Sequence, residues 1–299
     1  MTPQNEPRLS KTERTAQARE QARRIREAHA KKEKRNGWLI RGGVLLAAVV
    51  VVVIVALLIV QGTKKPEAIA DSGPVPANAN TYGGVVQDQN GVVKNASPGE
   101  VNKATLPAAP TAAAASAAAT DLASIGIAPS ADGKPVQIVA YIDFICPACN
   151  QFETKFGPQL KQWQDSGKAT IEYRAAGILD QFSTTNYSSR SAAAAACVVD
   201  TSPDKFADYF TQLFAQQPAE NSAGLSNDQL KKIAKDVGAA DISGCVDNKT
   251  YRPFVQYSTA TAHAHGVNGT PTVFVDGKQY TDTTVAFDAF AQPIIDAKK

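Results

Sequence analysis

Two short apolar runs and one regular spacing in the second half of the chain predict a strand, a helix and a second strand. Residues 136–142, VQIVAYI, are apolar on both faces and too short for a helix, which is typical of a buried central strand. Apolar side chains then recur at helical intervals, at Cys149, Phe152, Phe156, Leu160 and Trp163. Pro158 removes one backbone donor inside this helix and should kink it. Residues 169–175, ATIEYRA, alternate as a second strand.

The pattern that follows predicts a block of helices, a hairpin and a last helix. Helices are expected over about 191–199, 206–214 and 226–237, and Ser226 with Gln229 forms a capping box at the start of the third. Residues 272–280, TVFVDGKQY, read as two strands joined by an Asp276-Gly277 turn, before a helix over about 287–295. Helices on a mixed sheet make an α/β fold.

Near the N-terminus, residues 42–60 read GGVLLAAVVVVVIVALLIV, without a single charge. At about 1.5 Å per residue this run is long enough to cross a hydrocarbon core of about 30 Å. A cleaved signal peptide, with Ala68-Ile69-Ala70 as its cleavage site, is the alternative. Signal-peptide cores usually span only about 7–15 residues, so a retained signal anchor is favoured.

The charges around this run predict its orientation. Residues 1–41 hold twelve Lys or Arg against five Asp or Glu, whereas only Lys64 and Lys65 follow the run closely. Positive charge marks the cytoplasmic side, so we expect residues 1–37 to be a cytoplasmic tail and 38–61 a single-pass transmembrane anchor. The C-terminal domain is then extracytoplasmic at the cell membrane. A basic patch for nucleic acid is not expected, because the basic residues lead directly into the span.

Residues 62–133 are predicted to be an extracytoplasmic linker. Within them, residues 83–93 contain two short apolar pairs around Asn90-Gly91, which predicts a small hairpin that could add edge strands to the following domain. The Ala-rich stretch TAAAASAAAT, residues 111–120, has nothing bulky to bury and is predicted to be a tether or weak helix. The folded domain is expected over 134–299, with a helical insertion at about 183–265.

All four cysteines lie after the apolar run, and two of them form a Cys-Pro-Ala-Cys motif at residues 146–149. The motif falls at the start of a predicted helix, where free backbone N–H groups and the helix dipole favour a thiolate. Cys146, nearer the helix tip, is therefore the expected nucleophile. Cys149, one turn deeper, is placed to resolve a mixed disulfide. Pro147 suits the first turn because its missing N–H has no role there.

Two other readings of the motif are a structural disulfide and half of a zinc site. Zinc would require a second close pair of ligands, whereas Cys197 and Cys245 stand singly and His263 and His265 are too closely spaced. We expect neither a metal nor another cofactor.

The segments YIDFICPACNQFE (141–153) and HGVNGTPTVFVDGK (265–278) together resemble the DsbA-like branch of thioredoxin-fold oxidoreductases. The resemblance covers roughly residues 136–299 and implies a thioredoxin-like fold. It implies that Cys146 is the exposed attacking cysteine and Cys149 the buried resolving one. It also implies a cis-proline at Pro271 that packs over the disulfide, with Thr270 before it pairing its backbone with substrate.

Several further residues acquire expected roles from this resemblance. Asp143 is either a group that tunes the thiol or relays a proton, or an exposed aspartate at a strand end. Strongly oxidising relatives have a histidine where this chain has Ala148, so the redox strength stays open. In an oxidising compartment Cys197 and Cys245 are expected to form a structural disulfide, the alternative being two separate buried thiols.

The function expected is that of an extracytoplasmic thiol:disulfide oxidoreductase that introduces disulfides into exported proteins. Its partners would be exported substrates with free thiols, a membrane-bound re-oxidising protein, and the membrane through one span. A tethered reductase or isomerase of the same fold is the first alternative. A non-catalytic adaptor or chaperone, in which the motif is only structural, is the second.

Overall fold

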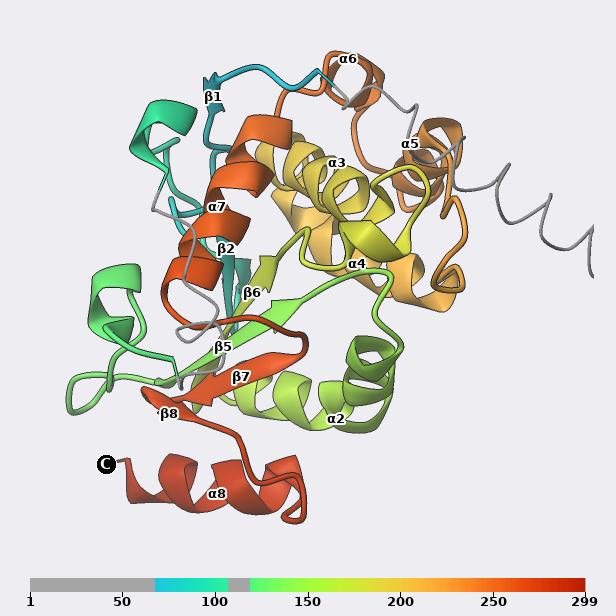
Figure 1. Cartoon of the computed structure of the whole chain (residues 1–299). Coiled ribbons are helices and arrows are strands. Elements are labelled where there is room, and N and C mark those ends of the chain that lie inside the picture. The colour runs from blue at the N-terminus through green and yellow to red at the C-terminus, as the bar shows by residue number, and fades with distance from the viewer. Residues whose placement is uncertain (1–67, 107–118, 299) are drawn as a thin grey trace, which may run out of the picture. The chain divides into compact units, whose positions relative to one another are not determined.

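The structure, a computed structural model, describes residues 68–106 and 119–298 (Figure 1). The expected anchor at 38–61 and most of the Ala-rich stretch lie outside these ranges. Among the helices of the described ranges, none combines the length and apolar character needed to cross a membrane.

The core is a six-stranded sheet in the order β3-β2-β6-β5-β7-β8. Its strands are β2 (Gly84–Asp88), β3 (Gly91–Val92), β5 (Val136–Ile142), β6 (Ala169–Ala175), β7 (Thr272–Val275) and β8 (Lys278–Gln279). β5 pairs with β6 in parallel and with β7 antiparallel, so the sheet is mixed. The predicted central strand, α/β class and C-terminal hairpin are confirmed.

Helices cover both faces of this sheet. α2 (Pro147–Asp165) and α8 (Phe287–Ala297) pack on the face of Ile138, whereas α7 (Arg252–Ala264) packs on the face of Val139 and Tyr141 (Figure 1). Alternate residues of β5 serve the two cores because successive strand side chains point to opposite faces. Since both faces are covered, β5 is apolar throughout, and the thioredoxin-like α/β fold follows.

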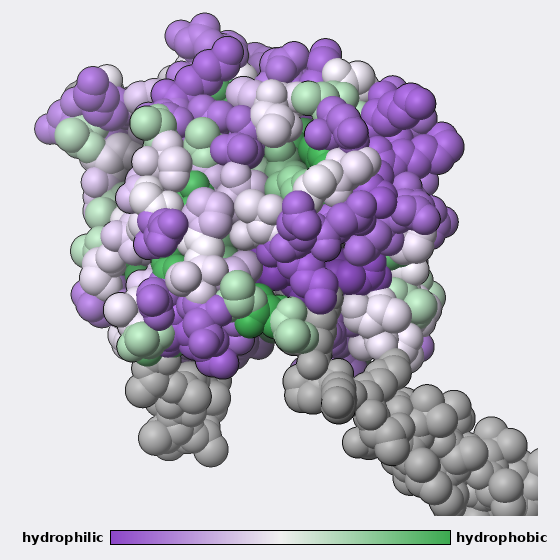
Figure 2. Space-filling model, turned by 90° about the horizontal axis from the view of Figure 1, so that it is seen from above, coloured by the Kyte–Doolittle hydropathy of each residue, from purple (hydrophilic) through white to green (hydrophobic). Residues whose placement is uncertain are grey.

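The helical insertion between β6 and β7 contains α3 (Tyr187–Thr201), α4 (Phe206–Ala215), α5 (Asn227–Asp236), α6 (Ser243–Asp247) and α7. α3 begins four residues earlier than expected. The predicted capping box is confirmed: Ser226 Oγ accepts from the Gln229 N–H at 3.2 Å, and Gln229 Oε1 accepts from the Ser226 N–H at 2.8 Å. Seen from above, the molecule is mostly polar, with apolar residues in small separate spots (Figure 2).

The prediction of a linker over 62–133 is wrong for the described residues of that range. The predicted hairpin is present as β2 and β3, and β2 pairs with β6 as part of the main sheet. A second small sheet joins β1 (Ser72–Pro74) to β4 (Glu100–Asn102). Isolated apolar residues of this segment are buried against the domain: Val75, Val85, Val101, Ile125 and Ile127. The folded unit therefore starts well before residue 134.

A buried ion pair explains why the N-terminal segment packs so closely. Arg174 Nε donates to Glu172 Oε1 at 2.7 Å, and both side chains are buried on β6. Asn80 Nδ2 also donates to this carboxylate, at 2.8 Å. A Cβ on Gly84 would lie 1.8 Å from Glu172 Oε1, so any larger residue there would displace this carboxylate from its partners. Buried charges require such partners, and the N-terminal segment supplies one of them.

Candidate functional site

The Cys-Pro-Ala-Cys motif lies where β5 ends and α2 begins. Cys146 is the N-cap of α2, Pro147 is its first residue, and Cys149 lies one turn further along the buried side. Both thiols are free. Pro147 and Ala148 are exposed, so the two positions between the cysteines face solvent. The expected helix-tip placement is confirmed.

The two cysteines differ less in exposure than expected. Cys146 is 4% exposed and Cys149 is fully buried, so the resemblance was wrong in implying an openly exposed Cys146. The reason is the loop before β7, where the Cys146 thiol contacts the Thr270 carbonyl oxygen at 3.2 Å. The order of accessibility between the two sulfurs is nevertheless the expected one.

Electrostatics separates the two thiols sharply. A hydrogen bond from the Cys149 thiol lowers the pKa of Cys146 to about 6, against the opposing effect of burial. Backbone N–H groups of the first helical turn act in the same direction. Burial, and the neighbouring Cys146 sulfur, raise the pKa of Cys149 well above its ordinary value. Near neutral pH the reduced pair therefore holds one thiolate, on Cys146.

The Thr270–Pro271 peptide bond is cis, as expected. Both residues are partly buried and lie directly before β7, which is hydrogen-bonded to β5. This pairing brings the Thr270 carbonyl to Cys146 across 124 positions of sequence. The site is thus built from two segments that are distant in the sequence, 141–153 and 265–278, which are the two that resemble DsbA-like proteins.

Asp143 is completely buried, so the reading of an exposed strand-end aspartate is wrong. Its Oδ1 accepts from the Ile145 N–H at 3.0 Å and its Oδ2 from the Leu179 N–H at 2.9 Å. Burial raises the pKa of Asp143 to about 7 despite these hydrogen bonds. The Asp143 carbonyl also accepts from the Cys146 N–H at 3.0 Å, so this residue braces the turn that positions the sulfur.

Two residues of the site carry no role in the sequence analysis. Gln217, just after α4, donates from Nε2 to the Cys146 carbonyl at 2.9 Å and to the Phe144 carbonyl at 3.2 Å. Asn150 donates to Gln217 Oε1 at 3.2 Å and to the Phe214 carbonyl at 3.1 Å. The helical insertion is thereby tied to the motif. In the sequence, only the position of Asn150 directly after Cys149 could have indicated a place in the site, and nothing near Gln217 did so.

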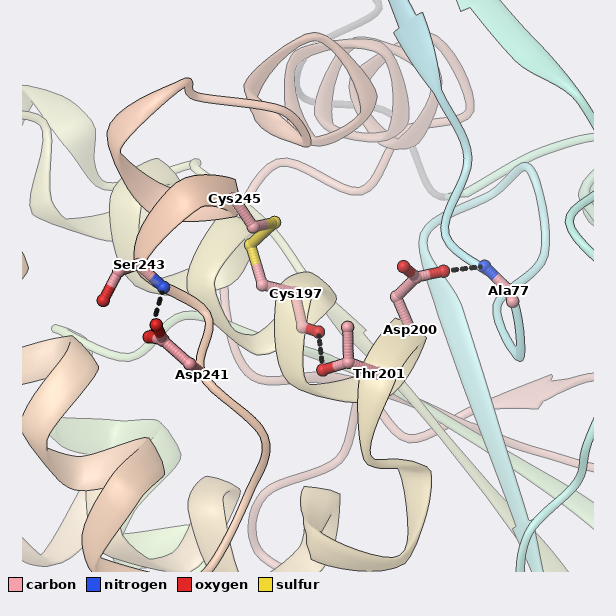
Figure 3. Close-up of a disulfide and its surroundings, with 7 residues drawn as sticks. All are labelled: Ala77, Cys197, Asp200, Thr201, Asp241, Ser243 and Cys245. Atoms are coloured by element: carbon pink, nitrogen blue, oxygen red, sulfur yellow. Dashed lines mark hydrogen bonds between the residues drawn. A yellow bond between two sulfur atoms is a disulfide. The ribbon is translucent and has the colours of Figure 1, made fainter.

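Cys197 and Cys245 form the expected disulfide, which joins α3 to α6 (Figure 3). Their Cα atoms are 6.0 Å apart and 48 positions separate them. Close by, Asp200 on α3 accepts from the Ala77 N–H at 2.9 Å, which ties the N-terminal segment to the same helix (Figure 3). The bridge fixes the helical insertion rather than the Cys146 turn.

A family model described as "Thioredoxin" matches residues 130–296, which is more than half of the chain. Among curated proteins, "Disulfide bond formation protein D" from Bacillus subtilis is 25% identical over 152 residues, covering 49% of this chain and 66% of that protein. "Serine/threonine-protein kinase PknE" from Mycobacterium tuberculosis is 28% identical over 150 residues, covering 47% of this chain and 26% of that protein.

Solved structures of similar proteins include DsbA from Mycobacterium tuberculosis, 31% identical, which covers 57% of this chain and 88% of that chain at a TM-score of 0.49. MdbA, a thiol-disulfide oxidoreductase from Actinomyces oris, is 16% identical and covers 75% of this chain and 92% of that chain. Its TM-score of 0.51 shows the shared fold.

The family match spans the Cys146 turn, the helical insertion and the cis-proline loop. These segments are connected through neighbouring strands of one sheet. The chain therefore belongs to the thioredoxin family, as a DsbA-like thiol:disulfide oxidoreductase.

Proposed function

We propose that this protein oxidises the thiols of exported proteins, with Cys146 and Cys149 as its redox pair. The observation that carries the proposal is the placement of both thiols at the tip of α2, with Cys146 as N-cap and Cys149 in the first turn. In keeping with this placement, the pKa of Cys146 falls to about 6 and the pKa of Cys149 rises. A stabilised thiolate lowers the free energy of the reduced form. The corresponding disulfide is then a stronger oxidant.

The reaction starts from the Cys146–Cys149 disulfide. A substrate thiolate attacks the Cys146 sulfur, the more accessible of the two, and forms a mixed disulfide while Cys149 leaves and takes up a proton. A second substrate thiolate then attacks the substrate sulfur of this bond and releases Cys146 as a thiolate. The substrate loses two electrons and gains a disulfide, and the cysteine pair gains the two electrons.

The surrounding residues orient this exchange. The Thr270 carbonyl lies 3.2 Å from the Cys146 sulfur, so the edge before β7 is the natural place for a substrate backbone to align. The Asp143 carbonyl accepts from the Cys146 N–H, and Gln217 Nε2 donates to the Cys146 carbonyl, so both polar groups of this peptide backbone are bonded. When no second substrate thiol is within reach, Cys149 attacks the Cys146 sulfur of the mixed disulfide. The Cys146–Cys149 disulfide then forms again and the substrate leaves as a reduced thiol.

The charge asymmetry around residues 42–60 supports an extracytoplasmic location for the domain, anchored by one span. The name of the Bacillus subtilis relative, a disulfide bond formation protein, supports the direction of electron flow. Each turnover leaves Cys146 and Cys149 reduced. A membrane-bound partner that re-oxidises them is therefore part of the proposal.

The test is the reduction potential of the Cys146–Cys149 pair, measured by equilibrating the full-length protein with glutathione buffers. We expect a value more oxidising than that of thioredoxin, which lies at about −270 mV. Ala148 contributes no charge beside the thiolate, so the value should lie below that of strong oxidants such as DsbA, at about −120 mV. A potential at or below the thioredoxin value would instead identify a tethered reductase.

A further inference from the structure

A cavity of about 590 Å³ lies between α2 and α4, and the exchange chemistry makes no use of it. Its floor is apolar and consists of Leu160, Ile171, Tyr173, Phe210 and Phe214, all buried. Along α4 its rim is formed by the short side chains of Ala207, Thr211 and Ala215, spaced four residues apart on one face. The volume is within the range of about 300–1,000 Å³ found for ligand sites. We call this cavity the α2–α4 groove.

Glu153 and Lys161 are the only acidic or basic residues among those that line the α2–α4 groove. Glu153 lies within it, and burial raises the pKa of this carboxyl to about 7. Its Oε2 accepts from the Tyr173 hydroxyl at 3.0 Å, and its Oε1 has no hydrogen-bond partner among the described residues. Lys161 at the rim is paired with Asp165 at 2.7 Å. A neutral apolar group therefore suits the groove better than a phosphate or another anion.

The groove continues into the face that presents Cys146. A shallow depression lined by Pro147, Asn150, Gln151, Thr154 and Gln217 lies beside the motif. Asn150 and Thr154 also line the groove, so the two hollows share a border. From Pro147 to Gly157 α2 rises by about 15 Å, at ~1.5 Å per residue. An extended chain covers that distance with about four or five residues.

We propose that the α2–α4 groove binds a bulky apolar side chain of the unfolded polypeptide whose cysteine reacts with Cys146, about five residues from that cysteine. This inference rests on the proposed function and adds a substrate preference to it. A polypeptide exposes such side chains before it folds and buries them afterwards. The groove thus favours unfolded chains over folded proteins with a surface cysteine.

The test compares peptides with one cysteine and a tryptophan five residues before or after it with peptides that have serine in place of the tryptophan. Rates of thiol exchange are measured with the oxidised full-length protein. Thr211→Trp fills the groove from its exposed rim. Gln212→Trp places the same side chain at the next position of α4, which is exposed and does not line the groove. Glutathione reports the chemistry of Cys146 alone.

We expect a tryptophan peptide to react about tenfold faster than its serine counterpart. This factor corresponds to about 1.4 kcal/mol. Thr211→Trp should abolish this advantage, Gln212→Trp should keep it, and the glutathione rate should be equal in all three proteins. Equal rates for the two peptides, or an advantage that persists in Thr211→Trp, would overturn the proposal.

A binding measurement separates this inference from the proposed function. Fluorescently labelled peptides with serine in place of the cysteine should bind the parent protein and Gln212→Trp, more weakly Thr211→Trp, and only when tryptophan is present. If glutathione fails to exchange with the parent protein, the redox proposal fails and this binding still supports the groove. Absence of tryptophan-dependent binding overturns the groove whatever the redox result.

Discussion

Cys146 and Cys149 lie within one turn of a helix tip, whereas Cys197 and Cys245 join two helices across 48 positions. At the first pair, free backbone N–H groups and a neighbouring thiol lower the pKa of one sulfur, and a loop containing Thr270 lies against it. At the second pair, Cys197 lies within α3, where the backbone N–H groups are already bonded in the helix. Cys245 lies in the first turn of the short helix α6, so a helix start alone does not separate the two pairs. The comparison teaches that a reactive pair has both sulfurs at one helix tip with a loop against them, whereas the structural pair joins two separate helices.

Removing one cysteine from each pair should produce the largest difference. In Cys149→Ser the Cys146 thiolate can attack a substrate disulfide, and the mixed disulfide should accumulate because the Cys149 thiol that would resolve it is absent; Cys146→Ser should accumulate none. Both variants should lose net oxidation of a reduced substrate protein. Non-reducing electrophoresis after acid trapping measures the adducts. Equal adduct formation by the two variants would contradict the assigned roles.

The structural pair should influence stability instead. Replacing Cys197 and Cys245 together by serine removes a cross-link that closes a long loop, and should lower the free energy of unfolding by about 2–4 kcal/mol. Denaturant titration at fixed pH measures this change. In the parent protein, mild reductant should open Cys146–Cys149 while peptide mapping still finds Cys197 linked to Cys245. Simultaneous reduction of both pairs would show that the Cys197–Cys245 bridge is no more resistant to reductant than the Cys146–Cys149 pair.

Asp143 should give the site its own pH dependence. Its folded-state pKa, about 7, is raised above the unfolded value of about 3.9, so the folded state binds the extra proton between these values. Its contribution to stability therefore falls as the pH rises from about 4 through 7. Asp143→Asn should remove this decline. The free energy of unfolding of the variant, measured relative to that of the parent protein, should therefore be higher at pH 8 than at pH 5. Denaturant midpoints at both pH values measure the effect, with the exposed Asp132→Asn as the comparison.

Ala148 offers the smallest and finest adjustment. It is exposed between the cysteines, so Ala148→His can add a positive charge near the Cys146 thiolate without disturbing the core. We expect a more oxidising potential by about 30 mV, which corresponds to ~1.4 kcal/mol for a two-electron couple. Ala148→Gln, of similar polarity without the charge, should leave the potential close to the parent value. An equal shift in both variants would show that charge is not the cause.

Much of the reaction centre follows from local patterns in the chain. The apolar run at 136–142, the cysteines at the start of the next helix and the Gly-Thr-Pro segment before a strand each carry their own signal. Strand period, helix ends and proline chemistry are short-range properties, so these elements could be predicted from a few neighbouring residues. The family resemblance then indicated that the two segments meet.

The surroundings of that centre were decided by contacts between distant residues. Gln217 reaches the Cys146 carbonyl from 71 positions away, and Asn80 reaches the Glu172 carboxylate from 92. The sequence around Asp143 does not show whether its side chain is exposed or buried. The packing of the segment around Leu179 buries it.

By itself the sequence determined the order of the strands from β5 onwards, the helices α2 to α5 and α8, and the position of Cys146 and Cys149 at a helix tip. It did not predict α6 or α7. Only the tertiary structure decided that residues 68–106 belong to the folded unit, that Cys146 is nearly covered, and that a groove opens between α2 and α4. Periodicity records which side of an element is apolar. It does not record which distant surface covers that side, and burial, pKa and cavities depend on that cover.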